Sequence, residues 1–259
     1  MGPARDALPE VSPLLLHVFG RLFARDLARS FHAVRRSGDP PSGSGPLVVY
    51  ANHPSWWDGE LFVWLAACVF CGQSAYTPME AAMLERYRFF GRIGGIGIAP
   101  GYAGAATFLA MGRAVLGRED GLWLVNAEGR FRDVRERPIR VAPGLAHLAR
   151  WAPAARFVPL AIEYAFWNER RPNLLLRFGD AIPANAVRTE GSAALNAALE
   201  GAMDALAVDA ALRDPGRFTT LIAGRTQISP VYDGWRRLRA RVQGRRFDPA
   251  HGAGRDASA

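Results

Sequence analysis

Short apolar runs alternate with longer segments of helical periodicity along most of this chain, and no other feature constrains its fold as strongly. The first run, Leu47–Ala51, is bounded by turn residues and predicts a buried strand. The segment after it, Trp56–Cys71, has the length of a helix. Further strands are predicted over 75–79, 95–99, 122–126, 157–164 and 174–178, and further helices over 81–90, 105–116, 143–151 and 192–206. The sequence therefore predicts an α/β domain with a largely parallel central sheet flanked by helices.

An amphipathic helical segment precedes this domain. Over residues 13–36, Leu and Phe recur at helical spacing beside a row of arginines. Such a helix suits a membrane interface, and it equally suits packing of its apolar stripe on the domain core; both interpretations stay open. A Gly-, Pro- and Ser-rich stretch follows it. We divide the chain into an N-terminal amphipathic helix and linker (1–44), a main domain (45–225), and a basic amphipathic tail with a C-terminus of disordered composition (226–259).

The charge of the chain favours an anionic partner. Its 32 basic residues, all arginine, exceed the 24 acidic ones and give a net charge of +8. Because the arginines are spread out and form no recognisable nucleic-acid motif, we expect a lipid surface and no nucleic acid. No apolar run reaches the roughly 18 residues that span a bilayer, and no secretory signal is recognisable. We therefore expect a cytoplasmic protein, peripheral on the inner face of the cell membrane.

The two cysteines, Cys68 and Cys71, form a C-x2-C pair. Such a pair can be half of a zinc site or a redox pair. No second Cys/His pair lies at a useful spacing and the flanking residues are apolar, so we expect buried thiols and no metal.

The residues best suited to catalysis lie directly after the first predicted strand. His53 follows that strand directly and should lie at the carboxyl edge of the sheet, where α/β folds bind ligands. Asp58 comes five residues later, and the spacing allows two interpretations. Ser55 and Asp58 form a capping box for the next helix, or Asp58 orients His53 as a general base acting on an acceptor hydroxyl. The spacing alone does not separate them.

The residues around this pair resemble a known family. Asn52-His53-Pro54-Ser55-Trp56-Trp57-Asp58 is similar to the N-H-x4-D motif of the glycerolipid acyltransferases, typified by lysophosphatidic acid acyltransferase. Three further segments resemble the later blocks of that family, in the same order: Gly95–Gly101, Asn126–Arg132 and Val158–Ala161. The resemblance covers roughly residues 45–180, and the order of the blocks makes it stronger than any one of them.

The resemblance implies transfer of a fatty acyl group from acyl-coenzyme A or acyl carrier protein to a hydroxyl of a lysophospholipid or other lipid-like acceptor. In that role His53 is the general base and Asp58 orients it. The acceptor-binding residues it implies are Glu128, Gly129, Arg130 and Arg132. No metal or bound cofactor is implied, because the acyl-thioester is a co-substrate. The alternative is a non-catalytic basic module that binds the membrane surface.

Two positions depart from the family pattern. Gly101 and Phe131 stand where the family has arginines that hold the acceptor phosphate. Arg130 and Arg132 flank Phe131, and a guanidinium can reach a phosphate from a neighbouring position. Otherwise the acceptor lacks that phosphate, as a hydroxylated terpenoid, a glycolipid or an aminolipid would. The sequence leaves this choice open.

Overall fold

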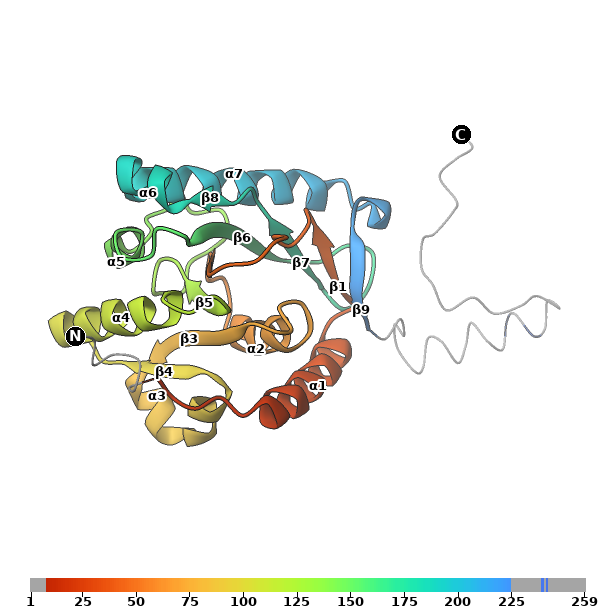
Figure 1. Ribbon diagram of the computed structural model, residues 1–259. Helices are drawn as coiled ribbons and strands as arrows, with labels where there is room; N and C mark the ends of the chain where they lie inside the picture. The colour runs from red at the N-terminus through yellow and green to blue at the C-terminus, as the bar shows by residue number, and fades with distance from the viewer. Residues whose placement is uncertain (1–7, 225–238, 240, 242–259) are drawn as a thin grey trace.

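The chain is built around one mixed sheet of nine strands. The computed structural model describes residues 8–224 together with 239 and 241, so the basic tail expected over 226–259 lies almost wholly outside the described residues. Figure 1 shows the sheet running through the molecule with helices on both faces. The strand order is β4-β3-β5-β2-β6-β7-β1-β9, and β8 pairs with β6. This arrangement confirms the expected α/β class.

Three parallel strands form the centre of the sheet. They are β2 (Leu47–Ala51), β5 (Gly121–Asn126) and β6 (Arg156–Ala165). β2 lies between the other two, with Ala51 in register with Asn126 on one side and Leu160 on the other. All five residues of β2 are buried, which explains its uninterrupted apolar sequence. Because the three strands run the same way, the residues that follow them meet at one edge.

The rest of the sheet is parallel on one side and mixed on the other. β3 (Ser74–Glu80) and β4 (Gly95–Ile98) continue the parallel part beyond β5. On the far side β7 (Asn173–Phe178) runs antiparallel to β6, β1 (Ala33–Ser37) is parallel to β7, and β9 (Thr219–Ala223) is antiparallel to β1. The short β8 (Ile182–Pro183) is antiparallel to β6. The sheet is therefore largely parallel, as expected, with antiparallel pairs added at one side.

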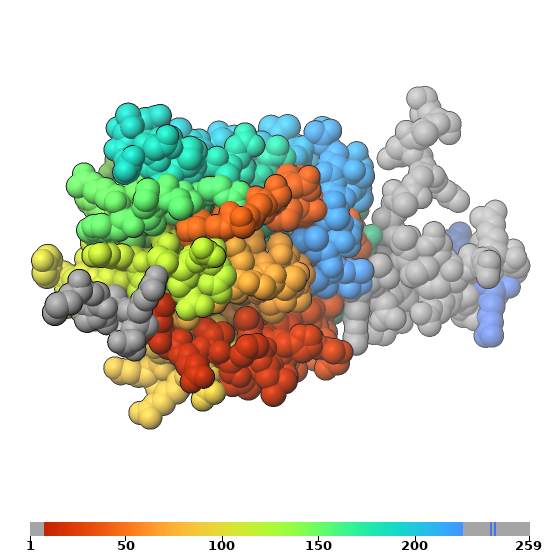
Figure 2. Space-filling view, in the orientation of Figure 1, coloured from red at the N-terminus to blue at the C-terminus, as the bar shows by residue number. Residues whose placement is uncertain are grey.

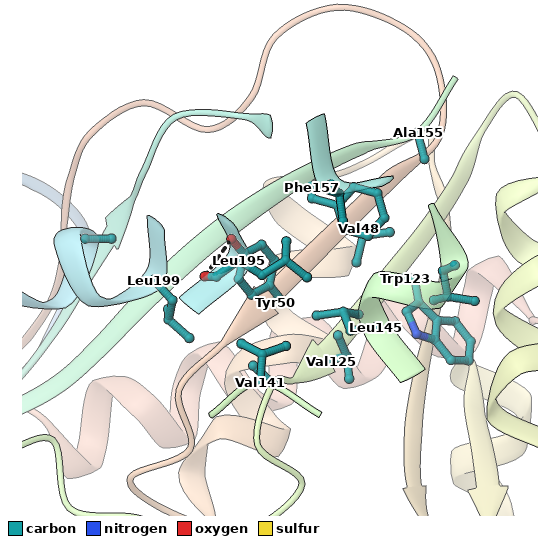
Figure 3. Close-up of a cluster of buried hydrophobic side chains, with 14 of the residues drawn as sticks. Val48, Tyr50, Trp123, Val125, Val141, Leu145, Ala155, Phe157, Leu195 and Leu199 are labelled. Carbon is teal, nitrogen blue, oxygen red and sulfur yellow. Dashed lines mark hydrogen bonds between the residues drawn. The ribbon is translucent and has the colours of Figure 1, made fainter. Parts of the chain in front are cut away.

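Two apolar layers cover the two faces of the sheet. One contains α4 (Gly101–Leu116), α5 (Pro143–Leu148), α6 (Ala184–Glu190) and α7 (Ser192–Ala211). Figure 3 shows part of this layer, where the Tyr50 hydroxyl donates to the Leu195 carbonyl at 3.3 Å. The other layer contains α1 (Pro13–Ser30) and α2 (Trp57–Cys68). The short α3 (Ala81–Arg86) and the 3-10 helices η2 (Arg88–Ile93) and η3 (Pro215–Arg217) complete the described helices.

The N-terminal helix is shorter than predicted. It ends at Ser30 rather than at residue 36, and Ala33–Ser37 form β1. The chain becomes extended at Phe31, and Val34 is fully buried in the sheet. The Arg35 side chain, expected on the basic side of the helix, donates instead to Asn173 at 3.1 Å and Thr220 at 2.7 Å. Segment 1–44 thus contributes a strand to the same sheet as the main domain.

The two cysteines also differ from expectation, because both are exposed. α2 buries Leu61, Phe62 and Leu65 against the sheet, and this leaves Cys68 facing outward at its end. Among the residues that the structure describes, no cluster of three or more His, Cys, Asp or Glu side chains has a geometry that would hold a metal ion. Within the same residues, no helix combines the length and the apolar content needed to cross a bilayer.

Candidate active site

Asn52 fixes the loop that leaves β2. Its side-chain oxygen accepts from the Ile162 backbone N–H at 2.8 Å, and its side-chain nitrogen donates to the Ile162 carbonyl at 2.9 Å. The amide therefore pairs with β6 as a further residue of the sheet would, and it is buried there. This pairing holds the next residue, His53, at the carboxyl edge of the central strands.

His53 and Asp58 are in direct contact. The imidazole Nδ1 and the Asp58 Oδ2 lie 2.6 Å apart. The Asp58 side chain is completely buried, whereas the His53 side chain is 16% exposed and so remains open to a substrate. Because an ionised carboxylate only accepts hydrogen bonds, Nδ1 carries the proton and Nε2 presents a lone pair. The sequence-predicted pair is thus in direct contact, with the carboxylate on one nitrogen of the imidazole.

The same carboxylate also begins helix α2. Asp58 Oδ2 accepts from the Ser55 backbone N–H at 3.2 Å, and the Ser55 hydroxyl accepts from the Trp57 backbone N–H at 3.4 Å. The first bond is one half of a capping box; the Ser55 hydroxyl accepts from the N–H two residues later rather than three, and Trp56 stands before the helix without a side-chain cap. Asp58 therefore contacts both the imidazole of His53 and the turn that leads into α2.

A third partner of Asp58 comes from β6 and was not predicted. The Tyr164 hydroxyl donates to Asp58 Oδ1 at 2.6 Å. Burial raises the pKa of Tyr164 far above its ordinary value, and the Asp58 carboxylate raises it further, so the hydroxyl keeps its proton. The alternation of β6 places Tyr164 on the same face as Leu160 and Ile162, toward α2. This alternation could have placed Tyr164 on that face from the sequence, but it does not predict a contact with Asp58.

The loop after β5 closes over His53. The Ala127 N–H donates to the Ala51 carbonyl at 2.7 Å, and the Arg132 N–H donates to the His53 carbonyl at 3.0 Å. Between them Gly129 reverses the chain with a φ of 64°. As a result the Phe131 ring lies against the imidazole of His53, with 4.1 Å between the ring centroids. Phe131 is 61% exposed and forms an outer wall of the site.

The charged residues of this loop bind one another. Arg132 Nη1 donates to the Glu128 carboxylate and, at 3.2 Å, to the Pro138 carbonyl, while its Nε donates to Glu136 at 3.0 Å. Glu128 also accepts from the Arg140 backbone N–H at 3.0 Å. Of the predicted acceptor-binding residues, the structure thus brings Glu128, Gly129 and Arg132 into the loop beside His53. It leaves Arg130 exposed to solvent.

Aromatic side chains connect the site to the N-terminal helix. Trp56 stacks on Trp57 with 4.4 Å between centroids, and Trp56 is 60% exposed. Phe31, just after α1, contacts both Trp57 and Tyr164, with centroids 5.2 and 5.6 Å away. The end of α1 therefore packs on the residues that surround the His53–Asp58 pair.

The other two segments that resemble family blocks, Gly95–Gly101 and Val158–Ala161, lie elsewhere in the fold. Val158–Ala161 lies within β6, in the buried centre of the sheet. Gly101 begins α4 after β4, with a φ of 77°. In the sheet β4 is separated from β2 by β3 and β5. Gly101 accordingly lies at the same edge of the sheet as His53, three strands further along.

Glu60 adds a second acid to this region. It lies on α2, two residues after Asp58, and its pKa is raised to about 7, first by burial and then by the Asp26 carboxylate of α1. One of its oxygens is buried with no hydrogen-bond partner among the described residues. The contact between α1 and α2 therefore holds a carboxyl group that titrates near neutral pH.

We expect Tyr164→Phe to destabilise the protein by about 1.5–3 kcal/mol, because it leaves a buried carboxylate oxygen without its donor. The free energy of unfolding in urea measures this. Tyr102→Phe is the matched control, since Tyr102 is 91% exposed, and it should change stability by less than about 0.5 kcal/mol. Equal stability of the two variants would contradict the importance of this bond.

We expect Glu60→Gln to alter the pH dependence of stability. The pKa of Glu60 in the folded protein, about 7, lies above its ordinary value of 4.5, so the wild type loses stability as the pH rises between these values. The Gln variant lacks this loss and should be more stable than wild type at pH 8 by about 1 kcal/mol after allowance for solvent screening. At pH 4 the two should agree. Unfolding at both pH values, with exposed Glu119→Gln as control, tests this.

Comparison with known proteins places this site in a known fold. No protein-family model matches the chain, and no curated protein is significantly similar to it in sequence. Seven chains of solved structures match. One of them is the crystal structure of the 1-acyl-sn-glycerophosphate (LPA) acyltransferase PlsC from Thermotoga maritima, with a TM-score of 0.54 and 12% sequence identity over 75% of this chain and 79% of that one. The chain thus has a fold similar to that of PlsC, and its His53–Asp58 pair is consistent with an H-x4-D motif.

Proposed function

We propose that the protein is an acyltransferase that moves a fatty acyl group from an acyl-thioester to a hydroxyl of a lysophospholipid or other lipid-like acceptor. The donor is acyl-coenzyme A or acyl carrier protein. The observation that carries this proposal is the His53–Asp58 hydrogen bond at the carboxyl edge of a PlsC-like sheet. The pair is a general base with its orienting acid, and the described residues close to it include no enzyme nucleophile placed to use that base.

The reaction follows from the geometry of the pair. The acceptor hydroxyl donates its proton to His53 Nε2 while its oxygen attacks the thioester carbonyl carbon. The new C–O bond forms, the C–S bond breaks, and the departing thiolate takes the proton from the imidazolium to leave as a thiol. Asp58 stabilises the imidazolium between these steps. Tyr164 and the Ser55 N–H, which both donate to Asp58, hold the carboxylate in place.

The loop after β5 is the proposed acceptor side of the site. Glu128, Gly129 and Arg132 give the loop its shape, and Arg130 lies on its exposed rim. The reaction as proposed uses no metal or bound cofactor, because the thioester itself is the activated group.

We further propose that α1 holds the protein on a membrane, at the inner face of the cell membrane. Three apolar residues one turn apart on α1 are exposed: Leu14 (72%), Val18 (41%) and Leu22 (47%). Three exposed arginines, Arg21, Arg25 and Arg29, continue the same face of α1 toward its C-terminal end. In Figure 2 α1 forms a red ridge on the lower side of the molecule. An exposed face that is apolar toward one end and basic toward the other suits the surface of an anionic bilayer, while the opposite side of α1 packs on α2.

We expect His53→Ala to lower acyl transfer from labelled acyl-coenzyme A into a panel of lysolipids by at least about 100-fold, the range of a lost general base. The matched control is His147→Ala, since His147 lies exposed on α5 and should leave the rate unchanged. Equal transfer by wild type and His53→Ala would refute the role of His53. Vesicle binding without any transfer by the wild type would instead favour the non-catalytic surface module.

We expect the triple variant Leu14→Ser, Val18→Ser, Leu22→Ser to bind vesicles containing anionic phospholipid at least about tenfold more weakly, because three apolar side chains no longer enter the interface. Replacing the three arginines by Gln should flatten the salt dependence of binding. Flotation measures both. The control is Val208→Ser with Leu212→Ser, at the exposed side of α7 and just after it. Unchanged binding by the α1 variants would exclude α1 as the membrane contact.

A further inference from the structure

We infer that the acceptor of this enzyme is a lipid alcohol or amino alcohol whose polar head carries no phosphate. The inference rests on the proposed acyl transfer and narrows its substrate class. Two observations carry it: an aromatic ring lies on the catalytic imidazole, and the neighbouring arginine is neutralised within the protein.

The first observation is the position of Phe131. Its ring lies against His53 at 4.1 Å between centroids and is mostly exposed. A hydroxyl that reaches His53 Nε2 therefore passes beside an apolar ring, and the atoms next to that hydroxyl pack on it. A phenyl ring has no hydrogen-bond donor for phosphate oxygens, and it favours a hydrocarbon neighbour over a dianion.

The second observation concerns Arg132, one of the two arginines that flank Phe131 in sequence. It lies between the carboxylates of Glu128 and Glu136 and also donates to the Pro138 carbonyl. Its side chain is only 10% exposed, and that of Glu128 only 2%. A phosphate at this point would meet two acids for one guanidinium. Arg132 therefore shapes the loop and offers no net positive charge to a ligand.

Two further arginines of the loop, Arg135 and Arg137, are also paired with carboxylates. Arg135 binds Asp133 through two hydrogen bonds, at 2.8 and 2.6 Å. Arg137 Nη2 donates to Asp204 of α7 at 2.6 Å. Arg130 remains exposed on the rim, where water screens its charge.

Matched acceptor pairs that differ only by a phosphate test the inference. The first pair is monoacylglycerol and lysophosphatidic acid with the same acyl chain, and the second is sphingosine and sphingosine 1-phosphate. With one labelled acyl-coenzyme A and the full chain, we expect kcat/KM to be at least roughly tenfold higher for the phosphate-free member of each pair. Transfer to the phosphorylated member at an equal or higher rate would overturn the inference and keep the proposed function. If the wild type transferred no acyl group to any of these four acceptors, both the inference and the proposed function would be overturned.

Variants at position 131 test whether Phe131 causes the preference for an acceptor without phosphate. We expect Phe131→Arg to shift the ratio of the two kcat/KM values toward lysophosphatidic acid by about tenfold, because it places an unpaired guanidinium beside His53. Phe131→Leu should keep the wild-type ratio. Trp151→Arg is the control for the added charge, since Trp151 is 46% exposed and lies before β6, at the opposite edge of the sheet. An unchanged ratio in Phe131→Arg, with transfer still dependent on His53, would refute the assignment to Phe131.

Discussion

The structure of the site depends on one buried carboxylate. Asp58 has no exposed surface, and an ion in that position is tolerated only when its lone pairs are satisfied. Its three donors come from two parts of the chain: the His53 ring and the Ser55 backbone N–H in the segment between β2 and α2, and the Tyr164 hydroxyl at the end of β6. Any movement of α2 against the sheet breaks at least one of these bonds. The orientation of the imidazole is therefore tied to the packing of the fold.

The sequence predicted the central strands well because they are buried on both faces and read as unbroken apolar runs. It failed at β1, where Arg35 and Arg36 continued the basic periodicity of α1 and hid a strand. That strand is stabilised by β7 and β9, about 140 and 190 residues away in sequence, and no local pattern reports such pairing. The strand's arginines are accommodated because Arg35 reaches Asn173 and Thr220 on its neighbours.

At the site, local sequence spacing was enough to predict the contact between His53 and Asp58, but not the contacts that other side chains make with this pair. His53 and Asp58 are five residues apart, so one turn at the start of α2 brings them together. Tyr164 is 106 residues from Asp58, and their contact depends on the register of β6 against β2. Phe131 was visible as a departure from a family pattern. Its place on the imidazole depends on the two backbone bonds that tie the 127–132 loop to β2, which no residue pattern encodes.

The His53–Asp58 pair and the loop after β5 are held by different kinds of contact. The pair is held by sheet register, the turn before α2 and a half-buried tyrosine, all of which also stabilise the core. The loop uses side-chain pairs four residues apart, Glu128–Arg132 and Arg132–Glu136. Such pairs can be exchanged without disturbing the sheet. A residue such as Phe131 can then replace an arginine, changing what lies next to the imidazole while the imidazole itself stays in place.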